Sequence, residues 1–142
     1  MENKTSMMLV YEISKLFDEM VSKHPDNIFA NEKTPRLILM ILSQNDGISQ
    51  SELVKSTHMK GSTISIAISK LEETGYIARE NNPYDMRSVR VYLTEKGRQL
   101  NARIKEIIRD TEIKIMEGIS AREQRAASFI LNSMLENLKK FK

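Results

Sequence analysis

The sequence has 142 residues, 40% hydrophobic and 29% charged, which is typical of one folded domain; its net charge of +3 comes from a basic excess after residue 47, mild support for a polyanionic partner. It contains no run of about 18 apolar residues and no signal-peptide pattern, so we expect a cytoplasmic protein without a membrane span. There is no cysteine and the two histidines, His24 and His58, are far apart, which excludes disulfides and thiolate chemistry and predicts no metal site and no cofactor.

Two helices are predicted in the N-terminal third. The first ends before Pro25 and has an amphipathic stripe formed by Leu9, Ile13, Leu16 and Met20. For the second, Thr34 is a suitable N-cap, Pro35 suits the first helical position and Gly47 suits the stop. Its segment 37–42 is apolar on nearly all sides, which indicates a central, buried helix.

A helix-turn-helix pattern follows. The residues SQSE, Ser49 to Glu52, form a capping box, in which the serine accepts a backbone N–H bond and the glutamate reaches back. The short helix that begins there is joined through a turn containing Gly61 to a second helix, which ends at Gly75. The apolar stripe of the second helix consists of Ile64, Ala67, Ile68 and Leu71.

The next segment predicts a β-hairpin. Residues 76–80 and 88–94 are rich in β-branched and aromatic side chains that alternate with period two. One face of the second strand carries Val89, Val91 and Leu93, and the other carries Arg90 and Tyr92. The intervening NNPYD, residues 81–85, predicts a turn with Asp85 and Arg87 at its exposed tip.

Two long helices complete the chain. Thr94 caps the first, and Gly118 with a second capping box, Ser120 to Glu123, separates it from the last. The last helix has the heptad spacing of helices that pack along their length, at Ala127, Leu131, Met134, Leu138 and Phe141. The terminal helices carry more apolar surface than one small core can cover, so we expect a homodimer formed through the chain ends.

The pattern therefore predicts a mainly α fold with a small β-hairpin wing. From Ile48 to Gly97 the sequence resembles the MarR family of bacterial transcriptional regulators, and the most specific piece is DMRSVRVYLTEKG, which matches the family's Asp-x-Arg wing tip followed by Leu-Thr-x-x-Gly. The resemblance implies a winged helix-turn-helix lobe plus a helical dimerisation domain built from both chain termini. It implies a homodimeric, sequence-specific DNA-binding regulator, usually a repressor, that many members release from DNA on binding a small, often phenolic or anionic, ligand.

The expected DNA-binding region is 34–103, with the helix-turn-helix at about 49–75 and the wing at about 76–93. The dimerisation region is expected at 1–33 and 104–142. A dimer of this type reads a pseudo-palindromic operator with half-sites about 10 bp apart.

The candidate DNA-binding residues fall into three groups. Hydroxyls can bond any base and an isoleucine can pack on thymine methyls, while lysines suit phosphates; on these grounds the recognition helix contributes Lys60, Ser62, Thr63, Ser65, Ile66, Ser69 and Lys70. The wing contributes Asp85, Arg87 and Arg90, with Arg87 suited to a narrow minor groove and Asp85 to positioning it. Ser49 and Gln50 lie at a helix N-terminus that suits a DNA phosphate, although Ser49 is first of all a cap. The wing departs from the family pattern at Asn81 and Asn82, whose positions are often basic.

The ligand site cannot be assigned from the sequence. The resemblance places it between the dimerisation helices and the lobe, and residues of suitable kinds are Tyr11, Phe17, Met20, His24 and Met40.

An alternative function is a winged-helix protein-interaction module without DNA binding, for which apolar residues would be expected on the recognition helix. An enzyme is not expected, because no phosphate loop, nucleophile–base set or carboxylate pair is present.

Overall fold

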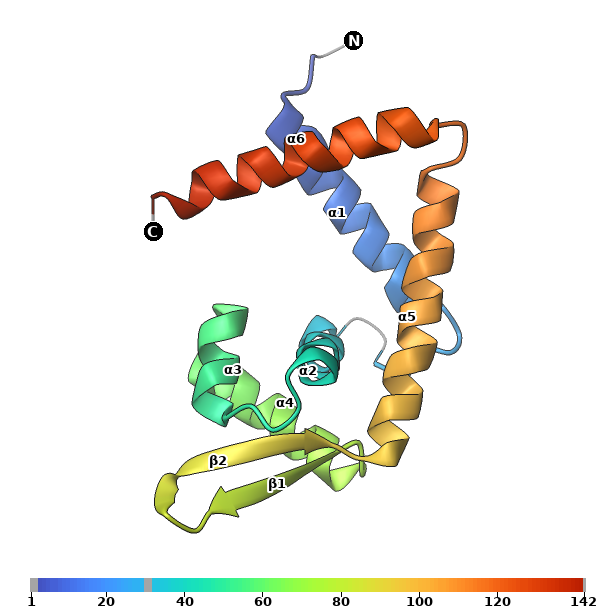
Figure 1. The fold of residues 1–142 in the computed structure, drawn as a ribbon. Coiled ribbons are helices and arrows are strands. Elements are labelled where there is room, and N and C mark those ends of the chain that lie inside the picture. Colours follow the sequence, from blue (N-terminus) through green and yellow to red (C-terminus); the bar gives the residue numbers. More distant parts are fainter. Residues whose placement is uncertain (1–2, 30–31, 142) are drawn as a thin grey trace. The chain divides into compact units, whose positions relative to one another are not determined.

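The computed structural model describes residues 3–29 and 32–141, and the side chains of Met86 and Arg87 lie outside that description. Within the described residues, six helices and one hairpin follow in the order α1 Ser6–Lys23, α2 Lys33–Gln44, α3 Gln50–Thr57, α4 Gly61–Glu73, β1 Ile77–Asn82, β2 Asp85–Leu93, α5 Glu95–Ile115 and α6 Ala121–Lys139 (Figure 1). The chain divides into two compact units, Met1–Ile108 and Arg109–Lys142. The predicted mainly α fold with a β-hairpin wing is confirmed.

The core of the first unit lies around α2. Ile38, Leu39 and Leu42 on this helix are fully buried, as the apolar run predicted, and they pack with α3, α4 and β2. Burying a side chain of this size stabilises the fold by about 1.5–3 kcal/mol relative to leaving it exposed. The other members of the core cluster are Leu53, Ile64, Ala67, Ile68, Leu71, Ile77, Val91, Leu93 and Ile104.

Side-chain caps start three helices where the sequence predicts them. The Ser49 hydroxyl accepts from the Glu52 N–H at 3.2 Å, and the Ser120 hydroxyl accepts from the Glu123 N–H at 3.1 Å. The Thr94 hydroxyl accepts from the Gly97 N–H at 3.1 Å at the start of α5. Each cap satisfies an N–H that has no partner within its own helix.

The predicted start of α2 is wrong. The helix begins at Lys33 with Glu32 as N-cap, so Pro35 is its third residue and Thr34 its second. Proline is tolerated there because the first-turn N–H groups have no intrahelical acceptor. The Thr34 hydroxyl instead approaches Met59 Sδ at 3.6 Å.

The hairpin is longer than predicted. β1 extends to Asn82 and β2 begins at Asp85, so only Pro83 and Tyr84 form the turn, and Asp85 and the backbone of Arg87 lie in β2. The Asn82 Oδ1 accepts from the Tyr84 N–H at 2.9 Å, which completes the turn locally and lets the strand resume at once.

The pairing of the hairpin changes register near its tip. Residues 77–81 pair regularly with residues 89–93, but Asn82 pairs with Asp85. One step along β1, from Asn81 to Asn82, therefore corresponds to four steps along β2, from Val89 to Asp85, which is an irregularity of the β-bulge type.

The other edge of β2 is also paired. Gly47 N donates to Val91 O at 2.9 Å, and Val91 N donates to Ile48 O at 3.0 Å. Ser49 and Arg90 form an isolated antiparallel bridge. The loop that leads into α3 thus acts as a short third strand, and it fixes the base of the wing to the helix-turn-helix.

The second unit contains the end of α5 and the whole of α6. Gly118 has φ +78°, a conformation that favours glycine, and it precedes the Ser120 cap of α6. No residue of α6 is buried. Among the described residues, no helix combines the length and apolar character needed to cross a membrane.

Candidate nucleic-acid interface

The α4 helix has one buried and one exposed face. The stripe predicted from the sequence, with Ile64, Ile68 and Leu71, is buried in the core. On the outer side Ser62, Thr63 and Ile66 are exposed, Ser65 and Ser69 are half-buried, and Lys60 and Lys70 are exposed. Ile66 is 61% exposed, which is a large apolar exposure in the middle of a hydroxyl-rich face. Hydroxyls beside one aliphatic group match the hydrogen-bonding edges and thymine methyls of a major groove.

The two lysines at the ends of this face differ in their surroundings. Lys60 is the N-cap residue of α4, and its side chain makes no capping hydrogen bond. Its exposed ammonium group is therefore not needed to begin the helix. Lys70 Nζ lies 3.5 Å from Glu32 Oε1, and both side chains are more than half exposed. An exposed ion pair of this kind contributes about 0–1 kcal/mol, so Lys70 can exchange Glu32 for another anion at little cost.

The N-terminus of α3 holds the two backbone candidates. The Ser49 hydroxyl is engaged with the Glu52 N–H and lies 3.2 Å from the Ser51 hydroxyl, and the residue is 9% exposed. Its structural role as a cap is therefore satisfied within the chain. Gln50 is half-buried as the first residue of the helix.

The wing is connected to the rest of the lobe by two arginines. Arg79 on β1 makes two hydrogen bonds to the Glu72 carboxylate of α4, Nε–Oε2 at 3.2 Å and Nη2–Oε1 at 2.9 Å. These bonds hold the pKa of Glu72 below its ordinary value and raise the pKa of Arg79. Arg90 on β2 donates from Nη1 to the Gly47 carbonyl at 2.9 Å. Both arginines thus position the hairpin, a role for Arg90 that the sequence did not indicate.

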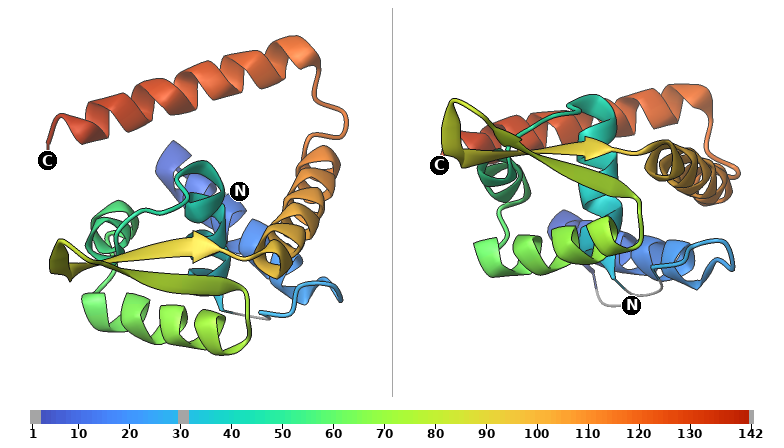
Figure 2. Two further views of the ribbon diagram at one scale, coloured as in Figure 1. Left: turned by 60° about the horizontal axis from the view of Figure 1, so that its bottom comes forward. Right: turned by 90° about the horizontal axis from the view of Figure 1, so that it is seen from below.

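The wing tip carries the remaining candidates. Asp85 is exposed at the start of β2, and the side chain of Arg87 is outside the described part of the chain. Tyr84 is 97% exposed in the turn. The structure therefore places α4, the N-terminus of α3 and the hairpin in one compact unit (Figures 1 and 2). The exposed candidate residues of α4 lie on its outer face.

Known proteins share both the sequence and the fold. The model of the MarR family matches residues 34–89. The chain is 30% identical over 100 residues to the HTH-type transcriptional repressor Rv2887 of Mycobacterium tuberculosis, covering 70% of this chain and 69% of the relative. The chain belongs to the MarR family of transcriptional regulators.

Solved MarR-family structures agree with this assignment. The crystal structure of a MarR-family regulator from Silicibacter pomeroyi superposes with a TM-score of 0.77 at 30% identity, over 93% of this chain and 88% of that one. A mutant MarR from E. coli complexed with operator DNA shares the fold, with a TM-score of 0.77 at 20% identity over 89% and 91% of the two chains.

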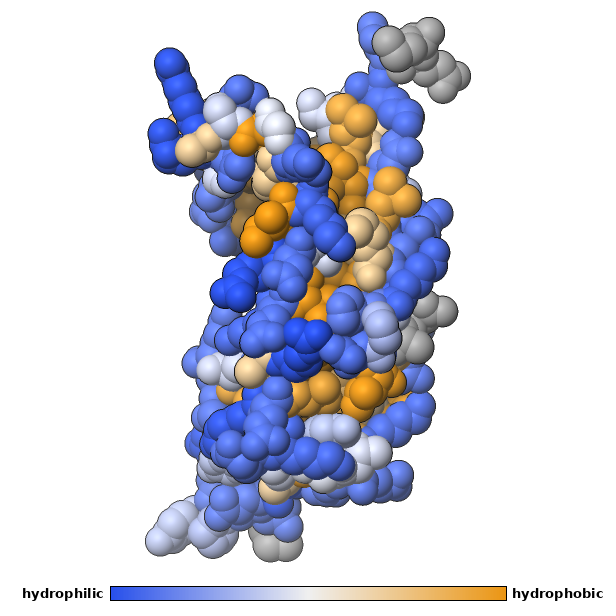
Figure 3. All heavy atoms as spheres, turned by 90° about the vertical axis from the view of Figure 1, so that its right-hand side faces the viewer, coloured by the Kyte–Doolittle hydropathy of each residue, from blue (hydrophilic) through white to orange (hydrophobic). Residues whose placement is uncertain are grey.

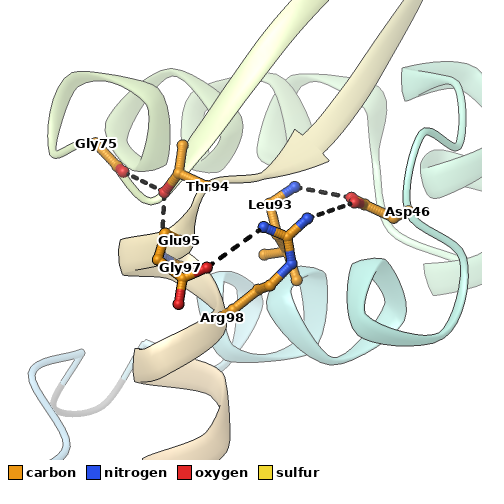
Figure 4. Close-up of polar contacts among 7 residues, drawn as sticks. All are labelled: Asp46, Gly75, Leu93, Thr94, Glu95, Gly97 and Arg98. Atoms are coloured by element: carbon orange, nitrogen blue, oxygen red, sulfur yellow. Dashed lines mark hydrogen bonds and ion pairs between the residues drawn. The ribbon is translucent and has the colours of Figure 1, made fainter.

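The Leu-Thr-x-x-Gly segment of this MarR-family chain has a structural explanation at the start of α5 (Figure 4). The Thr94 hydroxyl donates to the Gly75 carbonyl at 2.6 Å, and the Thr94 N–H donates to the Tyr76 carbonyl at 3.2 Å. A methyl group on Gly97 would overlap that Tyr76 carbonyl oxygen and lie 3.2 Å from Leu93 Cδ2. The segment therefore fastens α5 to the turn between α4 and the wing.

Three further residues that hold the start of α5 in place, Asp46, Lys96 and Arg98, were missed by the sequence reasoning. Asp46, before α3, accepts from the Leu93 N–H at 2.8 Å and lies 3.3 Å from Arg98 Nη2 (Figure 4). Lys96 Nζ donates to the Thr74 carbonyl at 2.7 Å and lies 4.5 Å from the Tyr76 ring centroid. Contacts across about 20 to 50 residues of chain leave no local pattern, although a glycine inside a helical segment, such as Gly97, is a signal of close packing.

A cavity of about 440 Å³ lies between α1, α2 and the first half of α5. Of the residues that the sequence suggested for a ligand site, Phe17 and Met40 line it, and Tyr11, Met20 and His24 do not. The full lining is Phe17, Asp18, Lys33, Arg36, Leu37, Met40, Gln44, Met59, Asn101, Ile104, Lys105 and Ile108.

The polar part of this cavity is an ion-pair group. Asp18 pairs with Lys33 Nζ at 2.6 Å and with Arg36 Nη2 at 3.0 Å, so two cations share one carboxylate. Within the described residues, Arg36 Nη1 is buried and has no hydrogen-bond partner. A buried cationic donor without an acceptor is costly, so this wall of the cavity favours an anion. The described residues contain no group of three or more acidic or histidine side chains that could hold a metal ion.

Proposed function

We propose that this MarR-family chain is a homodimeric, sequence-specific DNA-binding repressor that a small ligand releases from a pseudo-palindromic operator. The observation that carries the proposal is the outer face of α4, where Ser62, Thr63 and Ile66 are exposed beside a hairpin wing. The operator complex of the E. coli MarR mutant supports the same use of this fold. Such a protein acts where the operator DNA is, so we propose a cytoplasmic location.

The proposed contacts follow the candidate groups. Ser62, Thr63, Ser65 and Ile66 read base edges in the major groove, while Lys60, Ser69 and Lys70 contact phosphates. Arg87 enters the minor groove, positioned by Asp85, and the α3 N-terminus with Ser49 and Gln50 faces the DNA backbone, as does the exposed part of Arg90. A protein-docking module is the weaker alternative, because the exposed α4 face has one apolar residue among hydroxyls.

The exposed apolar faces of the terminal helices support the homodimer. Monomeric soluble proteins rarely leave a large contiguous apolar patch uncovered, and Figure 3 shows hydrophobic side chains reaching the surface. The exposed members on α1 are Met7, Met8, Leu9, Tyr11, Ile13, Leu16 and Met20, and those on α6 are Phe129, Ile130, Leu131, Leu135 and Leu138. We propose that segments 1–33 and 104–142 bury these faces against a second copy, and that 34–103 binds DNA.

The direct test is selection of bound duplexes from a random-sequence pool, followed by footprinting. The expected result is an inverted repeat with half-sites about 10 bp apart, because two lobes related by a two-fold axis meet the same face of the duplex. Selection of no duplex, or protection of one asymmetric half-site, would contradict the proposal.

Arg87→Ala tests the wing. We expect the affinity for the selected duplex to fall about 10–100-fold, since an arginine in a narrow minor groove interacts with its most negative potential. A gel-shift titration measures the loss, and circular dichroism checks the fold. Arg109→Ala on α5 removes the same charge outside the lobe and should bind as the unaltered protein does. Equal affinities for both variants would rule out the proposed role of Arg87.

The cavity suggests a test of ligand response with benzoate, an apolar ring with one negative charge, and benzamide, its uncharged analogue. Benzoate should bind and weaken the DNA complex, because its carboxylate can accept a hydrogen bond from the unpaired, positively charged Arg36 Nη1. Uncharged benzamide should not. Arg36→Met should weaken benzoate binding about tenfold or more, and Asp18→Asn should strengthen it, because Asp18 competes for Arg36. Calorimetric titration measures both; equal binding of benzoate and benzamide would contradict an anion site.

A further inference from the structure

Among the described large hydrophobic side chains of the hairpin, Tyr84 is the most exposed, at 97%. It occupies the second position of the two-residue turn, after Pro83, and its N–H is held by the Asn82 side chain at 2.9 Å. Pro83 fixes one backbone torsion and the Asn82 bond fixes the next peptide, so the turn holds Tyr84 in a defined place at little entropic cost. The turn stands clear of α3 and α4 in Figure 1 and in the left view of Figure 2.

Among the described side chains of the hairpin, both arginines make hydrogen bonds within the lobe. Arg79 is bound to Glu72, and Arg90 donates to the Gly47 carbonyl. Asn81 and Asn82 are uncharged. Arginines that are partly engaged within the lobe gain less from phosphate charge, so an uncharged contact at the wing tip would add to the binding energy if the tip touches DNA.

A tyrosine supplies such contact energy. Its ring buries a large apolar area for the loss of two side-chain torsions, and its hydroxyl can donate to an oxygen at the edge of the contact. The sugar–phosphate backbone at a groove edge offers both partners, an apolar deoxyribose face beside phosphate oxygens. The turn also lies directly before Asp85, in the same hairpin end as Arg87.

We propose that Tyr84 is a DNA-contacting residue, whose ring packs on a deoxyribose at the edge of the minor groove while its hydroxyl donates to the adjacent phosphate. The inference rests on the proposed function, because it requires that the hairpin approaches DNA. It adds a contact that is mainly apolar, and therefore weakly dependent on salt, to a wing whose other proposed contacts, Arg87 and Arg90, are cationic.

The salt dependence of binding separates these two contacts. With a duplex selected by the unaltered protein, Tyr84→Ala should raise Kd about tenfold, equivalent to roughly 1.4 kcal/mol, and leave the slope of log Kd against log salt unchanged. Arg87→Ala should reduce that slope by about one, since it removes one phosphate-neutralising charge. Tyr84→Phe should fall between the unaltered protein and Tyr84→Ala, because it keeps the ring and loses the hydroxyl.

Fluorescence gives an independent readout, because the chain has no tryptophan. In Tyr84→Trp the new indole is the only one, and its emission should be quenched or shifted as the selected duplex saturates the protein. Ile28→Trp places an indole at a site that is 56% exposed and outside the proposed DNA-binding region 34–103, and its emission should not change when the duplex binds.

The outcomes distinguish this inference from the function beneath it. If the unaltered protein selects and binds a duplex, but Tyr84→Ala binds equally well and the Tyr84→Trp emission is constant, the tyrosine contact is refuted and the function stands. If a fall in affinity comes with a reduced salt slope, the contact is ionic and the apolar contact is refuted. If the unaltered protein binds no duplex, both proposals fail.

Discussion

Gly97→Ala is expected to destabilise the lobe by about 3 kcal/mol or more, because the added methyl group has no free space. The position where it would lie overlaps the Tyr76 carbonyl oxygen, which belongs to the backbone and cannot rotate away. Relief requires α5 to move off the turn at residues 74–76, and this movement lengthens the Thr94 bonds to Gly75 and Tyr76. Urea unfolding followed by circular dichroism measures the change in unfolding free energy.

Gly61→Ala is the matched control for this prediction. Gly61 also lies in the first turn of a helix, α4, but a Cβ added there meets nothing within 4 Å. Where the added methyl group meets no other atom, replacing a helical glycine with alanine is expected to leave the unfolding free energy unchanged or to raise it by up to about 1 kcal/mol. If the two variants unfold at the same urea concentration, the close contact at Gly97 does not limit stability.

The double variant Leu131→Asp/Leu138→Asp is expected to sediment as a monomer at micromolar concentration and to lose operator binding by about 100-fold or more. Both leucines are at least half exposed in the single chain, so the substitutions cost little there. In a dimer that buries this face, four carboxylates would enter an apolar contact, and each would have to be desolvated. Sedimentation velocity and a gel shift on the selected duplex measure the two effects.

The control places carboxylates on another side of the helix. Asn132 and Lys139 have the same seven-residue separation, are both exposed, and lie among the polar residues of α6, about 100° around the helix from Leu131 and Leu138. Asn132→Asp/Lys139→Asp should remain dimeric and bind DNA. A dimer of the leucine double variant, or a monomer of the unaltered protein, would contradict the proposed dimerisation region.

Local sequence signals predicted the helices well, because a cap is decided within four residues. Ser49, Thr94 and Ser120 each accept the expected backbone bond. The start of α2 was wrong for a related reason: Thr34 and Pro35 are good starting residues, but a first turn also tolerates them at later positions. A helix start is therefore predictable where one hydroxyl can cap only one backbone N–H. It is less predictable where the same residues are tolerated at several positions of the first turn.

The wing and its attachment depended on distant residues. The alternation that buries Val91 and Leu93 is local and was predicted, and both are buried. The pairing of the Gly47 loop with β2, the Arg90 bond to Gly47 and the Asp46 bond to Leu93 join segments about 45 residues apart, and no pattern within either segment encodes them. The role assigned to Arg87 stays a prediction.

The two-sided pairing of residues 89–93 also bears on how this protein can change its target. Those residues pair with β1 and Val91 also pairs with the Gly47 loop, whereas the register shifts between Asn81 and Asn82 and the turn stands clear of α3 and α4. Insertions, deletions or grafted segments between Asn82 and Ser88 would change the end of the hairpin and leave the pairing of residues 89–93 in place. If the hairpin contacts DNA as proposed, changes in the length or sequence of its end would alter DNA recognition while the rest of the lobe keeps its structure.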